Sequence, residues 1–177
     1  MKNQKIIYLT HGAIIAALYM TLTILQNTLL PGTVSADIQF RISEALCVLA
    51  FFTPAAVPGL TIGCLLANIL AGLGAVDLVI GPLASLLAAL TMWLLRRARI
   101  KNIPFAGLLM PAVWNGLLVG FEIAFFFTDG GFTVPVFLTS AGFVAIGELA
   151  VLFVLGLPFT ILLDRNGKKW GITSPKK

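Results

Sequence analysis

Polar side chains that could bind a small solute stand inside the apolar segments of this sequence. They are Arg41, Glu44, Asn68, Asn115, Glu122 and Glu148. Arg41 and Glu44 are three residues apart, so a helix would place them on one face. A carboxylate accepts hydrogen bonds from N–H groups, whereas an amide both donates and accepts them. Together these residue types suit the recognition of a polar organic molecule.

Each of these residues also has a structural interpretation. Glu148 could be a protonated acid bonded to a neighbouring helix, and Glu122 could be solvated near the surface. Asn68 and Asn115 could join helices by hydrogen bonds. Arg41 and Glu44 could be a simple ion pair at the start of a helix. Because an ionisable group at membrane depth normally faces a bundle interior or a water-filled cavity, we expect the six side chains to surround a polar cavity.

The overall composition predicts an integral membrane protein. Hydrophobic residues make up 59% of the 177 residues, charged residues 11%, and the mean hydropathy is +1.01, whereas soluble domains carry about 25% charged residues. The two cysteines, Cys47 and Cys64, lie in apolar runs and indicate neither a disulfide framework nor a metal site. At about 20 residues per span, the length allows six transmembrane helices in one domain, residues 1–177.

The basic residues predict how the chain crosses the membrane. They cluster near the N-terminus, around 96–101 and after 164, and the positive-inside rule places all three clusters in the cytoplasm. With Pro and Gly as breakers, this gives an all-α bundle of six helices with both termini inside. The predicted spans are 6–26, 41–54, 58–74, 77–96, 104–127 and 136–163. Six of the seven acids, Asp164 excepted, then lie outside or in the outer half of the bilayer, and the cavity would open outward. The second span is short for a membrane of about 30 Å.

Several classes of function are excluded by missing motifs. The sequence has no P-loop for ATP. With His11 as its only histidine, it has no H-E-x-x-H zinc motif and no Ser-His-Asp triad. The basic charge is distributed as membrane topology requires, so nucleic-acid binding does not follow from it. We therefore predict no catalytic residue, no metal and no cofactor on this chain.

The first predicted helix carries two stripes of small residues. Ala13 and Ala17 form one, and Gly12 and Ala16 form the other. Small residues at this spacing let two helix backbones approach closely in lipid. Their position in the cytoplasmic half indicates either internal packing or a membrane partner.

Four segments resemble the QueT family of queuosine-precursor transporters. They are QFRISEAL at 39–46, Gly63-x-x-x-Ala67-Asn68, Asp77-x-x-x-Gly81, and Ile146-Gly-Glu-Leu149. The resemblance implies a substrate-binding S component of a bacterial energy-coupling-factor (ECF) transporter, located in the cell membrane. It also implies a transmembrane T component that docks on Ala13 and Ala17, and two partner ATPase subunits that use ATP. The implied substrates are 7-cyano-7-deazaguanine, its aminomethyl analogue and queuine.

A guanine-like edge offers two N–H donors to a carboxylate. On this resemblance we expect Glu148 to accept from that edge, with Asn68 or Asn115 on the remaining edge. Glu44 or Glu122 would face the 7-substituent, and Arg41 would order Glu44 or donate to the base. The alternatives are an S component for another vitamin-like solute, a self-sufficient secondary transporter with Glu148 as a proton-coupling acid, and a membrane scaffold without a ligand.

Overall fold

The computed structural model describes residues 2–33, 40–100 and 103–167. These residues form helices and connecting turns, and no strand occurs among them. In chain order the elements are α1 (Lys2–Leu29), η1 (Ile42–Phe51), α2 (Ala56–Leu70), α3 (Asp77–Leu95), α4 (Phe105–Leu108), α5 (Met110–Phe126), α6 (Val134–Val151), η2 (Leu152–Gly156) and α7 (Leu157–Asn166). Several residues used in the sequence analysis lie outside the described residues: Gln39 of the QFRISEAL segment, the acid Asp37, Lys101 of the second basic cluster, and the basic tail after residue 167.

Within this part of the chain, four helical stretches are long and apolar enough to cross a membrane. They are Asn3–Leu29, Asp77–Leu95, Phe105–Phe126 and Val134–Asn166. Two shorter apolar helices, η1 and α2, account for the second and third predicted spans. The all-helical class and the positions of the apolar helices are confirmed. The crossing of the membrane by the two short helices stays a prediction.

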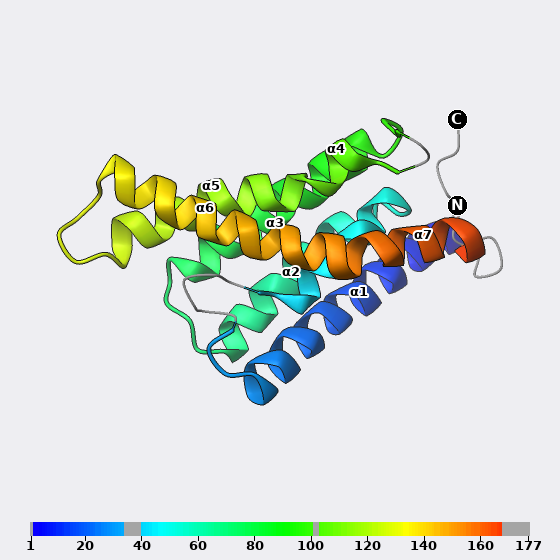
Figure 1. The fold of residues 1–177 in the computed structure, drawn as a ribbon. Helices are drawn as coiled ribbons and strands as arrows, with labels where there is room; N and C mark the ends of the chain where they lie inside the picture. Colours follow the sequence, from blue (N-terminus) through cyan, green and yellow to red (C-terminus); the bar gives the residue numbers. More distant parts are fainter. Residues whose placement is uncertain (1, 34–39, 101–102, 168–177) are drawn as a thin grey trace.

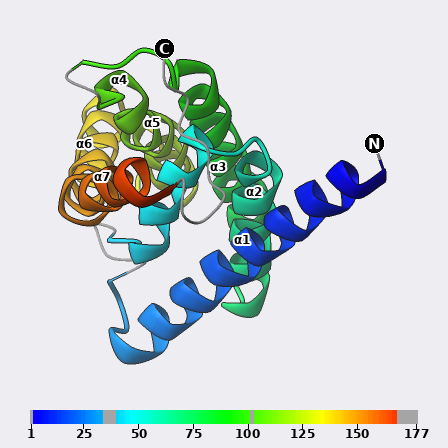
Figure 2. The same ribbon diagram turned by 90° about the vertical axis from the view of Figure 1, so that its right-hand side faces the viewer.

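The helices pack side by side in sequence, and η1 lies among them. α1 contacts α2, α2 contacts α3, α3 contacts α5, and α5 contacts α6, while η1 touches α1, α3 and the η2 segment. Figure 2 shows α1 at one edge of the bundle and α6 with α7 at the other. The beginning of α1, the α3–α4 connection and the end of α7 lie at the same end of the molecule (Figure 1). An ion pair of 2.7 Å between Arg99 and Asp164 joins two of these segments.

Small residues bring α1 and α2 into close contact. A Cβ atom placed on Gly63 would lie 2.9 Å from the carbonyl oxygen of Ala16 and 2.8 Å from Cβ of Tyr19. Gly12 and Ala16 therefore belong to internal packing against α2, as one of the two interpretations expected. Ala13 and Ala17 remain exposed on the other side of α1.

The helices α5 and α6 approach closely at Gly120. A Cβ atom there would lie only 2.6 Å from Cα of Ala141. Because tightly packed interiors tolerate little added volume, a glycine at this position lets the two helices approach closely. The same approach sets the position of Glu122, two residues further along α5.

The second predicted helix differs from expectation in its conformation. Residues 42–51 form a 3-10 helix of ten residues instead of an α-helix, although 3-10 runs longer than three or four residues are uncommon. Seven of its residues are buried, among them Phe51 and Val48 at 0% exposure. With a rise of about 2.0 Å per residue, ten residues cover about 20 Å, against about 15 Å for an α-helix. The 3-10 conformation therefore partly offsets the shortness of this segment.

The last two predicted spans are interrupted. A turn at Leu109 separates α4 from α5, directly before Met110-Pro111 at the start of α5. The final stretch contains the π-helical segment η2 between α6 and α7, and Pro158 follows at the start of α7. A proline removes a backbone donor and disturbs the preceding turn, which accounts for irregular backbone at both places.

Candidate functional site

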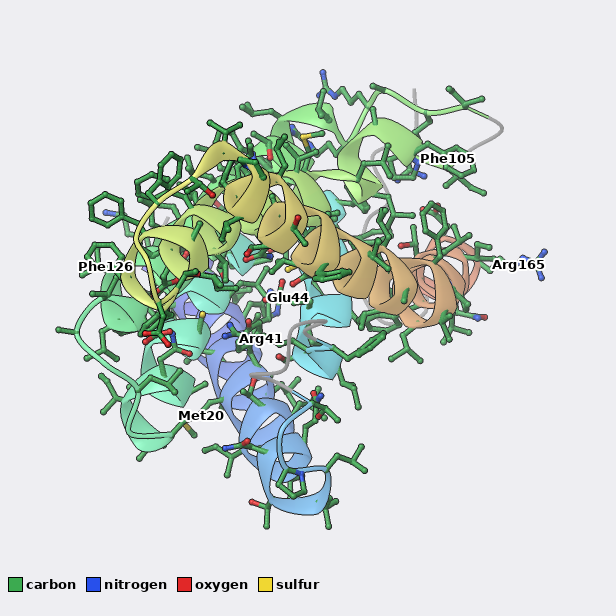
Figure 3. The ribbon with its side chains drawn as sticks, turned by 60° about the vertical axis from the view of Figure 1, so that its left-hand side comes forward. Met20, Arg41, Glu44, Phe105, Phe126 and Arg165 are labelled. Carbon is green, nitrogen blue, oxygen red and sulfur yellow. The ribbon has the colours of Figure 1, made fainter. Side chains whose placement is uncertain are left out.

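A cavity of about 640 Å³ opens between the ends of five helices. Its walls are the end of α1, the end of α2, the start of α3, the end of α5 and the first half of α6. These segments lie at the end of the molecule opposite the basic clusters, as Figure 3 shows for Phe126 on α5 and Arg165 on α7. Its polar side chains include Thr23, Arg41, Asn68, Asp77, Glu122 and Ser140, and its aromatic ones Phe127 and Phe143.

The start of η1 is held in place by a glutamine of α1. Gln26, which is 5% exposed, accepts a hydrogen bond from the backbone N–H of Ile42 at 2.8 Å and donates to the carbonyl of Phe40. One turn before it on α1, the Thr23 hydroxyl bonds the Ser43 hydroxyl at 2.8 Å. These contacts fix the backbone on both sides of Arg41. The arginine side chain consequently points into the interior beside Glu44 (Figure 3).

Glu44 is completely buried and is bonded by neighbouring side chains. The hydroxyl of Tyr19 donates to its Oε1 atom, and the Cys47 thiol donates to its Oε2 atom at 3.0 Å. Tyr19 is also fully buried. Because hydrogen bonds to buried charge are the strong ones, this network anchors η1 to α1. Glu44 is not among the residues that line the cavity.

Several buried polar atoms in and behind the cavity wall have no hydrogen-bond partner among the described residues. They are Arg41 Nε, Asn115 Nδ2 and Glu148 Oε2. Glu148 is 3% exposed and interacts electrostatically with Arg41 and Glu44. A buried polar atom left unpaired costs about 1–3 kcal/mol. A polar molecule that formed hydrogen bonds with these atoms would remove this cost, so such bonds would contribute most to its binding.

At the outer part of the cavity two carboxylates come together from different helices. Asp77 begins α3, and Glu122 lies near the end of α5; the two interact electrostatically. Asn68 on α2 donates to the backbone carbonyl of Asp77 at 2.9 Å and so holds the start of α3. Glu122 is 2% exposed, and its Oε1 atom has no hydrogen-bond partner in the described ranges.

Of the predicted site residues, Arg41, Asn68 and Glu122 line the cavity. Glu44, Asn115 and Glu148 are buried but are not among its lining residues. The sequence analysis did not assign Tyr19, Thr23 and Gln26 to the site. Their spacing of four and then three residues places them on one face of α1, so a polar stripe in an apolar helix was the available signal.

One known protein family matches most of the chain, including the residues around the cavity. A model of the QueT transporter family matches residues 9–165. The chain belongs to the QueT transporter family. The matched range contains all eight predicted site and docking residues, from Ala13 to Glu148.

A curated relative supports the same assignment to the QueT transporter family. The chain is 33% identical to the "Queuosine precursor transporter QueT" of Lactococcus lactis subsp. cremoris (strain MG1363), over 96% of this chain and 97% of the relative. No solved structure matches the chain significantly. With its apolar helices, this QueT-family chain is a multi-pass membrane protein, and its family places it among transporters rather than enzymes.

The size and the lining of the cavity suit a small polar substrate, as a transporter requires. A space of about 640 Å³ is within the range of small-molecule sites, about 300–1,000 Å³. Acceptors, donors and two aromatic rings surround it. These groups can bind a flat polar ring by hydrogen bonds at its edges and by contact with its faces.

Proposed function

We propose that this chain is the substrate-binding S component of an ECF transporter that imports a queuosine precursor. The resemblance of its motifs, its family and the name of its Lactococcus relative support the proposal. The substrate would be 7-cyano-7-deazaguanine, its aminomethyl analogue or queuine. ATP would be hydrolysed by two partner ATPase subunits, since the sequence has no P-loop.

The proposed topology has six spans in the bacterial cell membrane, with both termini in the cytoplasm. Support comes from the three basic clusters, which the positive-inside rule places inside. The helix ends that line the cavity lie at the opposite end of the molecule from the described parts of these clusters (Figure 1). The cavity would therefore face the outside, where an importer captures its substrate.

The observation that carries the proposal is the cavity with its orphaned polar atoms. A deazaguanine presents adjacent N–H donors on one edge, which a carboxylate can accept as a pair. We assign Glu148 to this edge, with Asn115 and Arg41 on the neighbouring acceptors. Glu148 lies five residues beyond Phe143 of the cavity wall, which is about 7.5 Å along a helix. The base would thus point inward, with its ring between the aromatic side chains.

The same orientation leaves the 7-substituent near the mouth. Of the two acids expected there, Glu44 already accepts bonds from Tyr19 and Cys47, whereas Glu122 lines the cavity. We therefore assign Glu122 to this end of the substrate. Asn68 supports it by holding the start of α3.

The first experiment is thermal stabilisation of the detergent-purified protein by the three deazaguanines, guanine and a panel of vitamins. A ligand that binds only the folded state raises its stability. Selective stabilisation by a deazaguanine is the expected result. Stabilisation by an unrelated vitamin would show that the substrate is not a deazaguanine. Uptake by vesicles that contain no ATPase partner would contradict the ECF mechanism and favour secondary transport.

A substitution tests the role of Glu148. Glu148→Gln removes a buried charge-assisted acceptor and should weaken deazaguanine binding by at least about 2 kcal/mol, measured by calorimetric titration. Asp164→Asn is the matched control, because it makes the same acid-to-amide change at the other end of the molecule. Equal affinities for the two variants would contradict the assignment.

The proposed docking surface for the T component is the exposed stripe of Ala13 and Ala17. The neighbouring stripe already packs against α2, so this face is free within the described structure. Replacing both alanines with Trp should abolish co-purification with the T component while substrate binding persists. Ala106→Trp, at an exposed alanine of α4, serves as control. Loss of substrate binding in the double variant would instead indicate internal packing.

A further inference from the structure

The outer part of the cavity carries more negative than positive charge. Asp77 and Glu122 both line it, and the lining residues include one basic side chain, Arg41. Arg41 also interacts electrostatically with Glu44 and Glu148, which lie behind the wall. One guanidinium thus interacts with Glu44, Glu148 and Glu122, and the region also contains the carboxyl group of Asp77.

In the described parts of the chain neither Asp77 nor Glu122 forms a salt bridge. The salt bridge found there joins Arg99 to Asp164, at the other end of the molecule. Glu122 is 2% exposed; its carboxyl group is hydrogen-bonded to that of Asp77, and its Oε1 atom lacks a hydrogen-bond partner among the same residues. A buried carboxylate is costly unless it is paired with a cation or bonded to donors. An incoming group with positive charge and N–H donors would supply both to Asp77 and Glu122.

We infer that Asp77 and Glu122 form an anionic subsite that binds a protonated amine on the 7-substituent of the substrate. This inference rests on the proposed function and narrows it. An alkylamine resembles the lysine side chain, whose ordinary pKa is about 10.4, so it is a cation at neutral pH. The aminomethyl compound and queuine carry such an amine. The nitrile of the cyano compound is neutral and has no N–H donor to offer the two carboxylates.

The consequence is a measurable preference among compounds with the same ring. A hydrogen bond to a charged group contributes about 1.5–3 kcal/mol, and about 1.4 kcal/mol corresponds to a factor of ten in affinity. We therefore expect the purified full-length protein to bind 7-aminomethyl-7-deazaguanine about 10- to 100-fold more tightly than the 7-cyano compound. Calorimetric titration of both compounds at neutral pH measures this ratio without any mutation.

Variants then assign the preference to the two acids. Glu122→Gln and Asp77→Asn should each reduce the ratio of the two affinities about tenfold or more. The matched control is Asp129→Asn, which removes an exposed acid of the α5–α6 loop outside the cavity and should keep the wild-type ratio. Thermal unfolding without ligand verifies that each variant is folded. If Glu122→Gln does not fold, the ratio of the two affinities in the wild type and in Asp77→Asn still tests the anionic subsite.

The outcomes separate this inference from the proposed function. Binding of both deazaguanines with equal affinity would overturn the anionic subsite and leave the queuosine-precursor assignment in place. A ratio that persists in both cavity variants would also overturn it. Binding of neither compound would overturn the proposed function, and the subsite with it.

Discussion

The close approach of α5 and α6 at Gly120 predicts a large effect for one added methyl group. In Gly120→Ala the new Cβ would lie 2.6 Å from Cα of Ala141, 0.8 Å short of ordinary van der Waals contact at 3.4 Å. The obstacle is backbone, also at the Ala141 nitrogen at 2.8 Å, so no side-chain rotation relieves it. The helices must separate, and a gap of 0.5–1 Å already forfeits about a quarter to a half of each dispersion contact.

A matched variant isolates this steric effect. A Cβ on Gly142, in α6 beside Ala141, meets no atom within 4 Å. Both alanine variants gain the same intrinsic helix preference, up to about 1 kcal/mol. Because overpacking typically costs about 1–3 kcal/mol, Gly120→Ala should be less stable than Gly142→Ala by about 2 kcal/mol.

Thermal unfolding in detergent measures the difference. For a chain of this length, 1 kcal/mol corresponds to about 2–4 °C in Tm, so the two variants should differ by about 4–8 °C. Deazaguanine affinity should also fall in Gly120→Ala, since Val119 and Glu122 of the cavity wall are on the displaced segment. Equal melting temperatures would refute the close approach of the two helices.

Three further substitutions test contacts elsewhere. Tyr19→Phe removes a donor to the buried carboxylate of Glu44 and should lower the free energy of unfolding by about 1.5–3 kcal/mol; wild-type denaturant stability would contradict this contact. Gln26→Leu releases the backbone around Arg41 and should weaken ligand binding at least about tenfold in a titration, since the N–H of residue 42 loses its acceptor; wild-type affinity would argue against this anchoring. Asp164→Asn breaks a largely buried ion pair with the α3–α4 connection and should lower stability by about 1 kcal/mol in thermal unfolding; an unaltered Tm would show that the pair contributes nothing.

Much of the architecture could be predicted because a membrane restricts the possibilities. Apolar runs, Pro-Gly breakers and basic clusters locate helices, and 77–95 was predicted within one residue at its C-terminal end. The 3-10 conformation of 42–51 could not be predicted. That segment is buried by several neighbours at once, so its sequence has no periodic face that distinguishes one helix type from another.

Arg41, Asn68 and Glu122 line a cavity as the sequence analysis expected, whereas the bonding of Glu44 was not foreseen; that these residues bind substrate stays a prediction. Asn68 and Glu122 both line the cavity, because they lie near the C-terminal ends of α2 and α5, which run in the same direction. The engagement of Glu44 depends on Tyr19, which is 25 residues away. A contact over that separation follows from the packing of η1 on α1, which a single sequence does not specify.

The burial of η1 has a consequence for how the protein is made. This segment of ten residues spans about 20 Å, less than the roughly 30 Å of hydrocarbon in a bilayer, and Arg41 and Glu44 stand at its beginning. Without neighbours it would expose buried charge to lipid, a costly arrangement. Tyr19 and Gln26, which bond its first residues, leave the ribosome earlier, but α3 and the η2 segment on its other sides leave later. Ribosome-bound chains that end before residue 152 lack the η2 segment, so they should hold η1 outside the bilayer core, open to cysteine labelling at Cys47, and full-length chains should protect it. The order in which helices settle in the membrane would then differ from their order in the sequence.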